Sequence, residues 1–193
     1  TIWPGDYPGK VSARLRVTLS QLRTVIDPDR TGKEASYRLR EHDGTLAAVE
    51  SDWFTSDVWR LEELLDGSPT LESTAEAIEI VRPGVGDDLQ EIAELATAFD
   101  TLVDRTVAQR CAVGEQLLAA GDARAACDVA NGLIAVAPLS ERAAALSIAA
   151  SLGVSDSVAA RAAVDRCRAV LEQLDVDPSP TTAMLLRRVE RIA

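Results

Sequence analysis

The first apolar pattern of the chain repeats with the period of an α-helix. In the segment ARLRVTLSQLR, leucines at positions 15, 19 and 22 recur every three or four residues, and this spacing places them on one face of a helix. The opposite face should meet solvent, yet it centres on the branched apolar residue Val17. We therefore predict an amphipathic helix from about residue 9 to residue 26 whose outer face touches a partner.

The pattern then changes to one that is typical of a β-hairpin. The segment SYRLREHDGTLAAVE predicts a strand, a turn at Asp43–Gly44 and a second strand, because an Asp-Gly pair between two strand-like runs is a strong hairpin signal. A short helix is predicted next, in TSDVWRLEELLDG, with a cap near Ser56 and an end at Gly67.

From Ser73 onward the periodic segments are all helical. Ser73 and Glu76 form a capping-box pattern for a helix that ends near Arg82. A longer pattern from about residue 89 to residue 120 predicts a helix in two pieces, and four amphipathic segments follow it.

Two of these later segments share an order of helix end, glycine turn and alanine-rich helix. Gly121 and Gly153 lie 32 residues apart, which is close to the period of about 34 in tetratricopeptide helix pairs. We predict a mainly α fold that ends in a tetratricopeptide-like array, with an ordinary helical bundle as the alternative.

Charge and aromatic residues divide the chain of 193 residues into two parts. Residues 1–40 carry eight Lys and Arg against four Asp and Glu, whereas the remainder carries 12 against 27. Six of the seven aromatic residues precede position 60. A basic front and an acidic back indicate two units with different roles. The chain does not begin with methionine, so we expect it to be part of a longer protein.

The sequence contains no pattern that is typical of an active site, a cofactor site or a metal site. Its three cysteines, Cys111, Cys127 and Cys167, are far apart, and His42 is the only histidine, so no metal-ligand spacing is present. The glycines of RPGVGDD lack the Lys-Ser/Thr of a phosphate loop. We predict no enzyme and no cofactor, and expect the cysteines to be buried, reduced thiols.

The hydropathy of the chain gives no sign of a membrane segment. No apolar run approaches the length of a membrane span, and no signal peptide is visible. We therefore expect a cytoplasmic protein that makes no membrane contact within this segment.

A helix followed by a hairpin is the order of the second half of a winged helix-turn-helix, whose last helix enters the major groove of DNA. In that arrangement Val17 contacts a thymine methyl group, Ser20 and Gln21 reach base edges, and nearby arginines pair with phosphates. The predicted DNA-binding residues are Arg14, Arg16, Val17, Ser20, Gln21, Arg23 and Thr24.

The order of motifs resembles a known family. IWPGDYPGKVSARLRVTLSQLR followed by YRL resembles the winged-helix end of the Streptomyces antibiotic regulatory protein (SARP) type of activator. FTSDVWRLEELL, the helix pairs and LEQLDVDPSPTTAMLLRRV resemble the bacterial transcriptional activator domain (BTAD) that follows it. The resemblance implies that residues 1–55 are the C-terminal part of an OmpR-type DNA-binding domain. It also implies that residues 56–193 are a tetratricopeptide-like domain, which in the family contributes to oligomerisation and regulation.

Two functions therefore remain open. The first is a transcriptional regulator that binds DNA through the winged helix, and the basic front favours it. The second is a BTAD-type protein-interaction module of a larger actinobacterial protein that no longer binds DNA. The acidic back favours this second function, because its charge repels a duplex, and so does the absence of the first two helices of the winged helix. In both, the helical part binds a protein partner or a second copy of the chain.

Overall fold

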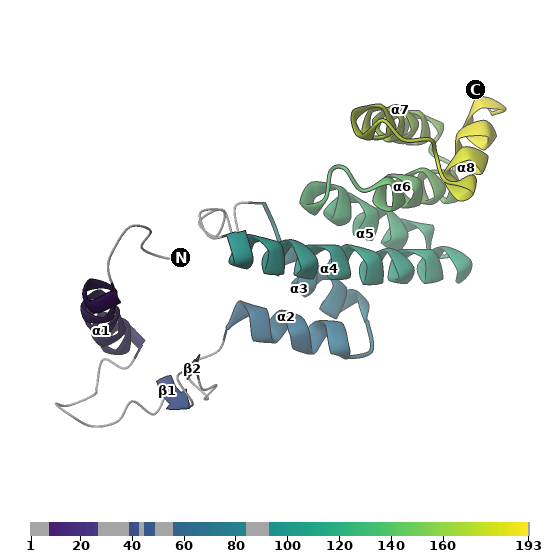
Figure 1. Cartoon of the computed structure of the whole chain (residues 1–193). Helices are drawn as coiled ribbons and strands as arrows, with labels where there is room; N and C mark the ends of the chain where they lie inside the picture. Colours follow the sequence, from purple (N-terminus) through teal and green to yellow (C-terminus); the bar gives the residue numbers. More distant parts are fainter. Residues whose placement is uncertain (1–7, 27–38, 43–44, 49–55, 84–92, 193) are drawn as a thin grey trace. The chain divides into compact units, whose positions relative to one another are not determined.

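A computed structural model of the chain describes residues 8–26, 39–42, 45–48, 56–83 and 93–192 (Figure 1). The chain divides into two compact units, Thr1–Arg60 and Leu61–Ala193. The predicted turn at Asp43–Gly44 and the predicted start of the long helix near residue 89 lie outside the described residues. We describe the two units separately and call the second one the helical domain.

The first unit contains a helix and a two-stranded sheet. Helix α1 (Pro8–Ile26) spans the predicted segment and begins with a proline, which suits the first turn of a helix because its missing N–H has no partner there. Strands β1 (Leu39–His42) and β2 (Thr45–Ala48) pair antiparallel, with Leu39 opposite Ala48 and His42 opposite Thr45. The strand order agrees with the prediction, whereas the winged-helix assignment stays a prediction.

The helical domain is a stack of antiparallel helix pairs (Figure 1). Its helices are α2 (Asp57–Asp66), whose first turn belongs to the first unit, α3 (Leu71–Ile80), α4 (Ala93–Ala119), α5 (Ala123–Val136), α6 (Glu141–Gly153), α7 (Ser157–Leu174) and α8 (Pro180–Glu190). From α3 to α8 each helix packs against the next, and α4 also contacts α6 while α6 contacts α8. Helices α4, α6 and α8 therefore form one row, and α5 and α7 lie beside it. The described part of the chain is thus mainly helical, as predicted.

The turns that follow α4 and α6 repeat each other. Asp122 caps α5 by accepting a hydrogen bond from the N–H of Ala125 at 3.1 Å, and Asp156 caps α7 in the same way from Ala159 at 2.9 Å. The preceding residues both have positive φ angles, +86° at Gly121 and +59° at Ser155. The period between these turns is 34 residues, the length of a tetratricopeptide repeat. The predicted match of Gly121 to Gly153 was wrong, because Ser155 occupies the left-handed position of the second turn.

Two other sequence predictions need correction. The capping box of α3 joins Thr70 and Ser73, not Ser73 and Glu76: the Thr70 hydroxyl accepts the Ser73 N–H at 3.1 Å and the Ser73 hydroxyl accepts the Thr70 N–H at 2.8 Å. Helix α4 is one piece from Ala93 to Ala119. Gly114 does not break it, because its role is packing: a Cβ there would lie 2.4 Å from a methyl carbon of Leu146 in α6.

The three cysteines are free thiols that differ in exposure. Cys111 and Cys167 are fully buried in two different hydrophobic clusters, as predicted. Cys127 is only half-buried, so the prediction was wrong for this residue. Burial raises the pKa of the Cys111 thiol to about 11.

This difference predicts selective labelling by a thiol reagent. We expect a disulfide reagent at neutral pH to modify Cys127 in the native protein, and to modify Cys111 and Cys167 only after unfolding, because a reagent needs both access and thiolate. Peptide mapping after a timed quench identifies the labelled sites. Rapid native labelling of all three residues would contradict the packing of α4 and α7.

Candidate functional site

The predicted DNA-binding residues all lie on α1, and most of their side chains are open to solvent. Arg14, Arg16, Val17, Ser20, Gln21 and Thr24 are exposed, whereas Arg23 is half-buried. Val17 is 58% exposed and lines a shallow hollow of about 340 Å³ with Ala13, Arg14 and Thr18. An exposed valine within a hollow on a helix surface is suited to apolar contact with a ligand.

The seven residues are not equivalent. The Thr24 hydroxyl donates to the backbone oxygen of Ser20 at 3.0 Å, so it is already engaged within the helix. The Nε of Arg23 is buried and has no hydrogen-bond partner. Both residues are therefore poorer candidates for ligand contact than Arg16, Val17 and Gln21.

The opposite face of α1 does not form the core that the sequence pattern indicates. Leu15 is 43% exposed and Leu22 is 38% exposed, while Leu19 is half-buried. The reason is that, among the described residues, no other helix or strand packs closely against α1.

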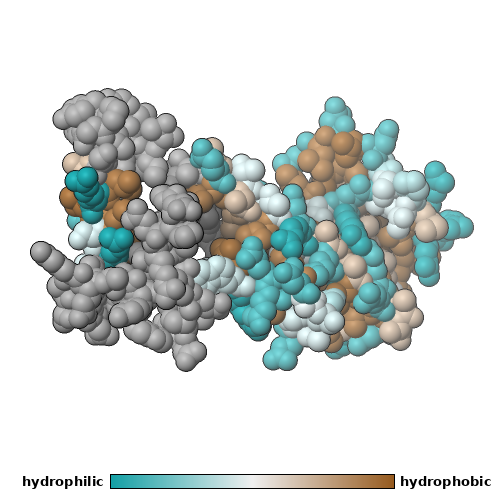
Figure 2. Space-filling model, turned by 60° about the horizontal axis from the view of Figure 1, so that its bottom comes forward, coloured by the Kyte–Doolittle hydropathy of each residue, from teal (hydrophilic) through white to brown (hydrophobic). Residues whose placement is uncertain are grey.

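The helical domain has its own groove, between α4, α6 and α8. The groove has a volume of about 420 Å³, within the range of small-ligand sites and short peptide sites. The floor of the groove is apolar and consists of Leu118, Ala145, Leu146, Ala149 and Leu185. Its rim includes Glu115, Glu141, Arg142 and Thr181. Sequence analysis did not identify these residues, because they come from three helices that are distant in the sequence. On the coloured part of the face shown in Figure 2, hydrophilic and hydrophobic residues are interspersed.

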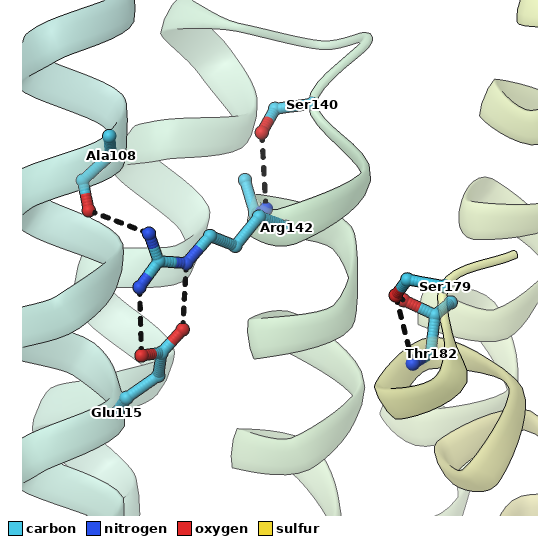
Figure 3. Close-up of polar contacts among 7 residues, drawn as sticks. Ala108, Glu115, Ser140, Arg142, Ser179 and Thr182 are labelled. Carbon is cyan, nitrogen blue, oxygen red and sulfur yellow. Dashed lines mark hydrogen bonds and ion pairs between the residues drawn. The ribbon is translucent and has the colours of Figure 1, made fainter.

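An ion pair forms one wall of the groove and joins α6 to α4. The Arg142 guanidinium donates to both carboxylate oxygens of Glu115, at 2.8 and 2.9 Å, and to the backbone oxygen of Ala108 at 3.1 Å (Figure 3). This forked geometry is the strong form of an arginine–carboxylate contact. The contact therefore links α6 to α4 along this side of the groove.

A carboxylate at the other side of the groove holds the start of α8. Glu141 accepts the N–H of Ser179 at 2.8 Å, and the Ser179 and Thr182 hydroxyls lie 3.0 Å apart (Figure 3). Burial acts to raise the pKa of Glu141, but hydrogen bonds from Thr182 and Ser179 outweigh it, so this pKa is lowered. The ionised carboxylate at a helix N-terminus is also favoured by the helix dipole.

These polar groups hold the helices in position. Their hydrogen bonds, including those of the Ser179 and Thr182 hydroxyls to the Glu141 carboxylate, are made within the domain. Among the residues that the structure describes, no three His, Cys, Asp or Glu side chains are grouped to hold a metal ion. None of the described helices has the length and apolar character needed to span a membrane.

Comparison with known proteins identifies the helical domain. A family model described as "Bacterial transcriptional activator domain" matches residues 57–190, which begin with α2 and end with α8. No curated protein and no solved structure matches the chain. The match spans more than half of the sequence and covers the whole series of helix pairs, so the chain belongs to the bacterial transcriptional activator domain family.

Proposed function

We propose that the chain is part of a transcriptional regulator in which α1 is the recognition helix of an OmpR-type winged helix. In this proposal residues 1–55 contact DNA and residues 56–193 form a tetratricopeptide-like domain for regulation and oligomerisation. The observation that carries the proposal is the exposed face of α1, where Val17 and Gln21 lie between Arg14 and Arg16. Membership of an activator-domain family supports it.

The chemistry of this face suits the major groove. Val17 offers an apolar contact for a thymine methyl group, and Gln21 offers a bidentate amide for an adenine edge. The arginines contact phosphates, which fixes the position of the helix without reading sequence. The β1–β2 hairpin follows as a wing beside the phosphates or the minor groove.

The proposal predicts different effects for Arg16 and Val17. Arg16→Ala should weaken binding to all DNA sequences and lower the slope of log affinity against log salt by about 1, because one phosphate contact is lost. Val17→Ala should change the preferred sequence instead. Selection of bound duplexes from a random pool by the full protein, followed by salt titrations with the selected duplex, measures both effects.

The control is Arg124→Ala, which removes the same charge from an exposed position on α5 and should leave DNA affinity unchanged. The proposal fails if neither Arg14→Ala nor Arg16→Ala alters affinity. It also fails if Arg124→Ala alters the affinity as much as they do, since binding would then reflect net charge alone.

The alternative is a protein-interaction module that does not bind DNA. The groove between α4, α6 and α8 favours this function, as does the excess of 27 acidic over 12 basic residues after position 40. Two carboxylates and one guanidinium on the groove rim favour a basic or apolar segment, from a protein partner or a second copy. Two results together would support this alternative. The random pool would yield no enriched duplex, and the chain would still bind a protein partner or a second copy of itself.

A further inference from the structure

Helix α2 is attached to the helical domain by a small number of side chains. Close packing of one helix on another joins α3 to α8 into the stack, and α2 lies outside this set of close packings. Its buried face consists of Leu61, Leu64 and Leu65, which share one hydrophobic cluster with Ala77 of α3 and with Val81 directly after it. The docking of α2 therefore depends on a few buried groups.

Two side chains of α4 hold the carbonyl end of α2. The Nε2 of Gln109 donates to the backbone oxygen of Leu65 at 2.6 Å, and the Nη2 of Arg110 donates to the backbone oxygen of Leu64 at 2.8 Å. Both oxygens belong to the last turn of α2, where the carbonyl groups of a helix have no partner within the helix itself. Gln109 and Arg110, called the α4 clamp below, supply these partners.

The α4 clamp also buries polar atoms that stay without partners. Among the described residues, nothing forms a hydrogen bond with the Nε and Nη1 of Arg110 or with the Oε1 of Gln109, and all three atoms are buried. The hydroxyl of Thr74 is in the same condition, one helical turn before Ala77 on α3. Buried donors and acceptors without partners cost free energy, which hydration recovers when the junction opens. The leucines therefore favour the docking of α2, and these polar groups oppose it.

We propose that α2 is a releasable helix, which leaves α4 as a unit while the helices from α3 to α8 stay folded, and that Arg110 sets how readily it leaves. A released helix of 10 residues is too short to be stable by itself, so release also unfolds it. The proposal does not depend on whether α1 binds DNA.

Release would change how the two units of the chain are joined. The first turn of α2 belongs to the first unit and the rest of α2 belongs to the helical domain, so the chain passes from one unit to the other through this helix. With α2 released, the first docked helix of the domain would be α3, which begins at Leu71. The segment that joins the units would then be longer by the whole of α2.

The alternative is that α2 is a permanent part of the core. Three buried leucines also fit a helix that opens only when the whole domain unfolds. The two hypotheses differ in one respect that can be measured. A change that destabilises the middle of the stack affects the exposure of α2 only if α2 opens together with the stack.

Native-state proteolysis of the full protein by thermolysin makes this measurement. Thermolysin cleaves before leucine residues, and the buried leucines of α2 become accessible only when this helix opens. Mass spectrometry of the products compares cleavage there with cleavage before Leu133 of α5, whose exposed fraction is 0%. We expect α2 to be cleaved at least about tenfold faster than α5, because a local opening needs less free energy than global unfolding.

Two substitutions test whether the opening is local and whether Arg110 controls it. Leu133→Ala should speed cleavage in α5 and leave cleavage in α2 unchanged, because Leu133 belongs to a different hydrophobic cluster from the leucines of α2. Arg110→Met should slow cleavage in α2 by at least about fivefold, because it removes the buried donors and keeps a side chain of similar length.

Arg105→Met is the matched control for Arg110→Met. Arg105 also lies on α4 and also contacts the end of α2, through an ion pair with Asp66 at 3.5 Å. The side chains of this pair are 50% and 78% exposed. Exposed ion pairs contribute little to stability, so this variant should change cleavage in α2 by no more than about twofold. A circular-dichroism melt checks that each variant is folded.

Four results would overturn the proposal. Cleavage in α2 that is no faster than in α5, or a Leu133→Ala variant in which both sites are cleaved faster by the same factor, would make α2 a permanent part of the core. An Arg110→Met variant that is unfolded or is cleaved faster in α2 would show that the guanidinium is needed for docking. Equal slowing by Arg105→Met and Arg110→Met would show that burial of the guanidinium is not what opposes docking.

Discussion

Leu133→Ala is expected to lower the free energy of unfolding of the helical domain by about 2–5 kcal/mol, the range for truncation of a fully buried leucine. Leu133 lies on α5 with an exposed fraction of 0%. It shares a cluster with Cys111 of α4 and Leu146 of α6, so the cavity opens where three helices meet. Urea unfolding followed by circular dichroism measures the change.

Val158→Ala is the matched control for this truncation. Val158 lies on α7 and is 77% exposed, so its replacement should change the free energy of unfolding by no more than about 0.5 kcal/mol. Equal effects of the two substitutions would mean that α5 is not the centre of the domain.

The second prediction contrasts two replacements of Arg110. This side chain on α4 is 0% exposed and donates one hydrogen bond, to the backbone oxygen of Leu64 at 2.8 Å. Its Nε and Nη1 are buried without partners, and burial lowers its pKa. A buried charge with unpaired hydrogen-bond donors lowers the stability of the folded state. Apolar residues of similar volume often replace buried charges without loss of stability.

We therefore expect Arg110→Met to be at least as stable as the parent protein and Arg110→Ala to be less stable by about 2–5 kcal/mol, because alanine leaves a large cavity. The Leu64 oxygen loses its partner in both variants, so their difference isolates the packing of the side chain. Thermal and urea unfolding of both variants test this. A large loss in Arg110→Met would show instead that the guanidinium holds the end of α2.

Local signals in the sequence predicted the helices well. The four amphipathic segments predicted after residue 120 correspond to α5, α6, α7 and α8. These local signals failed where a choice depended on distant contacts. The sequence predicts two pieces between about residues 89 and 120, but α4 is continuous from Ala93 to Ala119, and its Gly114 lies against Leu146 of α6.

The same limit applies to the sites. The exposed face of α1 could be predicted from the sequence because its residues lie on one helix. The hydrogen bond of the Thr24 hydroxyl and the burial of the Arg23 Nε could not be predicted in this way. The groove joins Glu115, Arg142 and Leu185 from three helices, and their proximity follows only from the stacking. The register of the repeat also needed the structure, because Gly121 corresponds to Ser155 and not to Gly153.

The succession of neighbouring helices also has a consequence for how the domain folds. From α3 to α8 the interhelical contacts join helices that are adjacent or next but one in the sequence, so few long loops must close before native contacts form. Topologies of this kind have low contact order and fold rapidly, and their energetics approximate a one-dimensional chain of coupled units. Among the described helices, α8 packs closely only on α6 and α7, whereas α6 packs on four others. We therefore expect the amide hydrogens of α8 to exchange through an opening of lower free energy than those of α6.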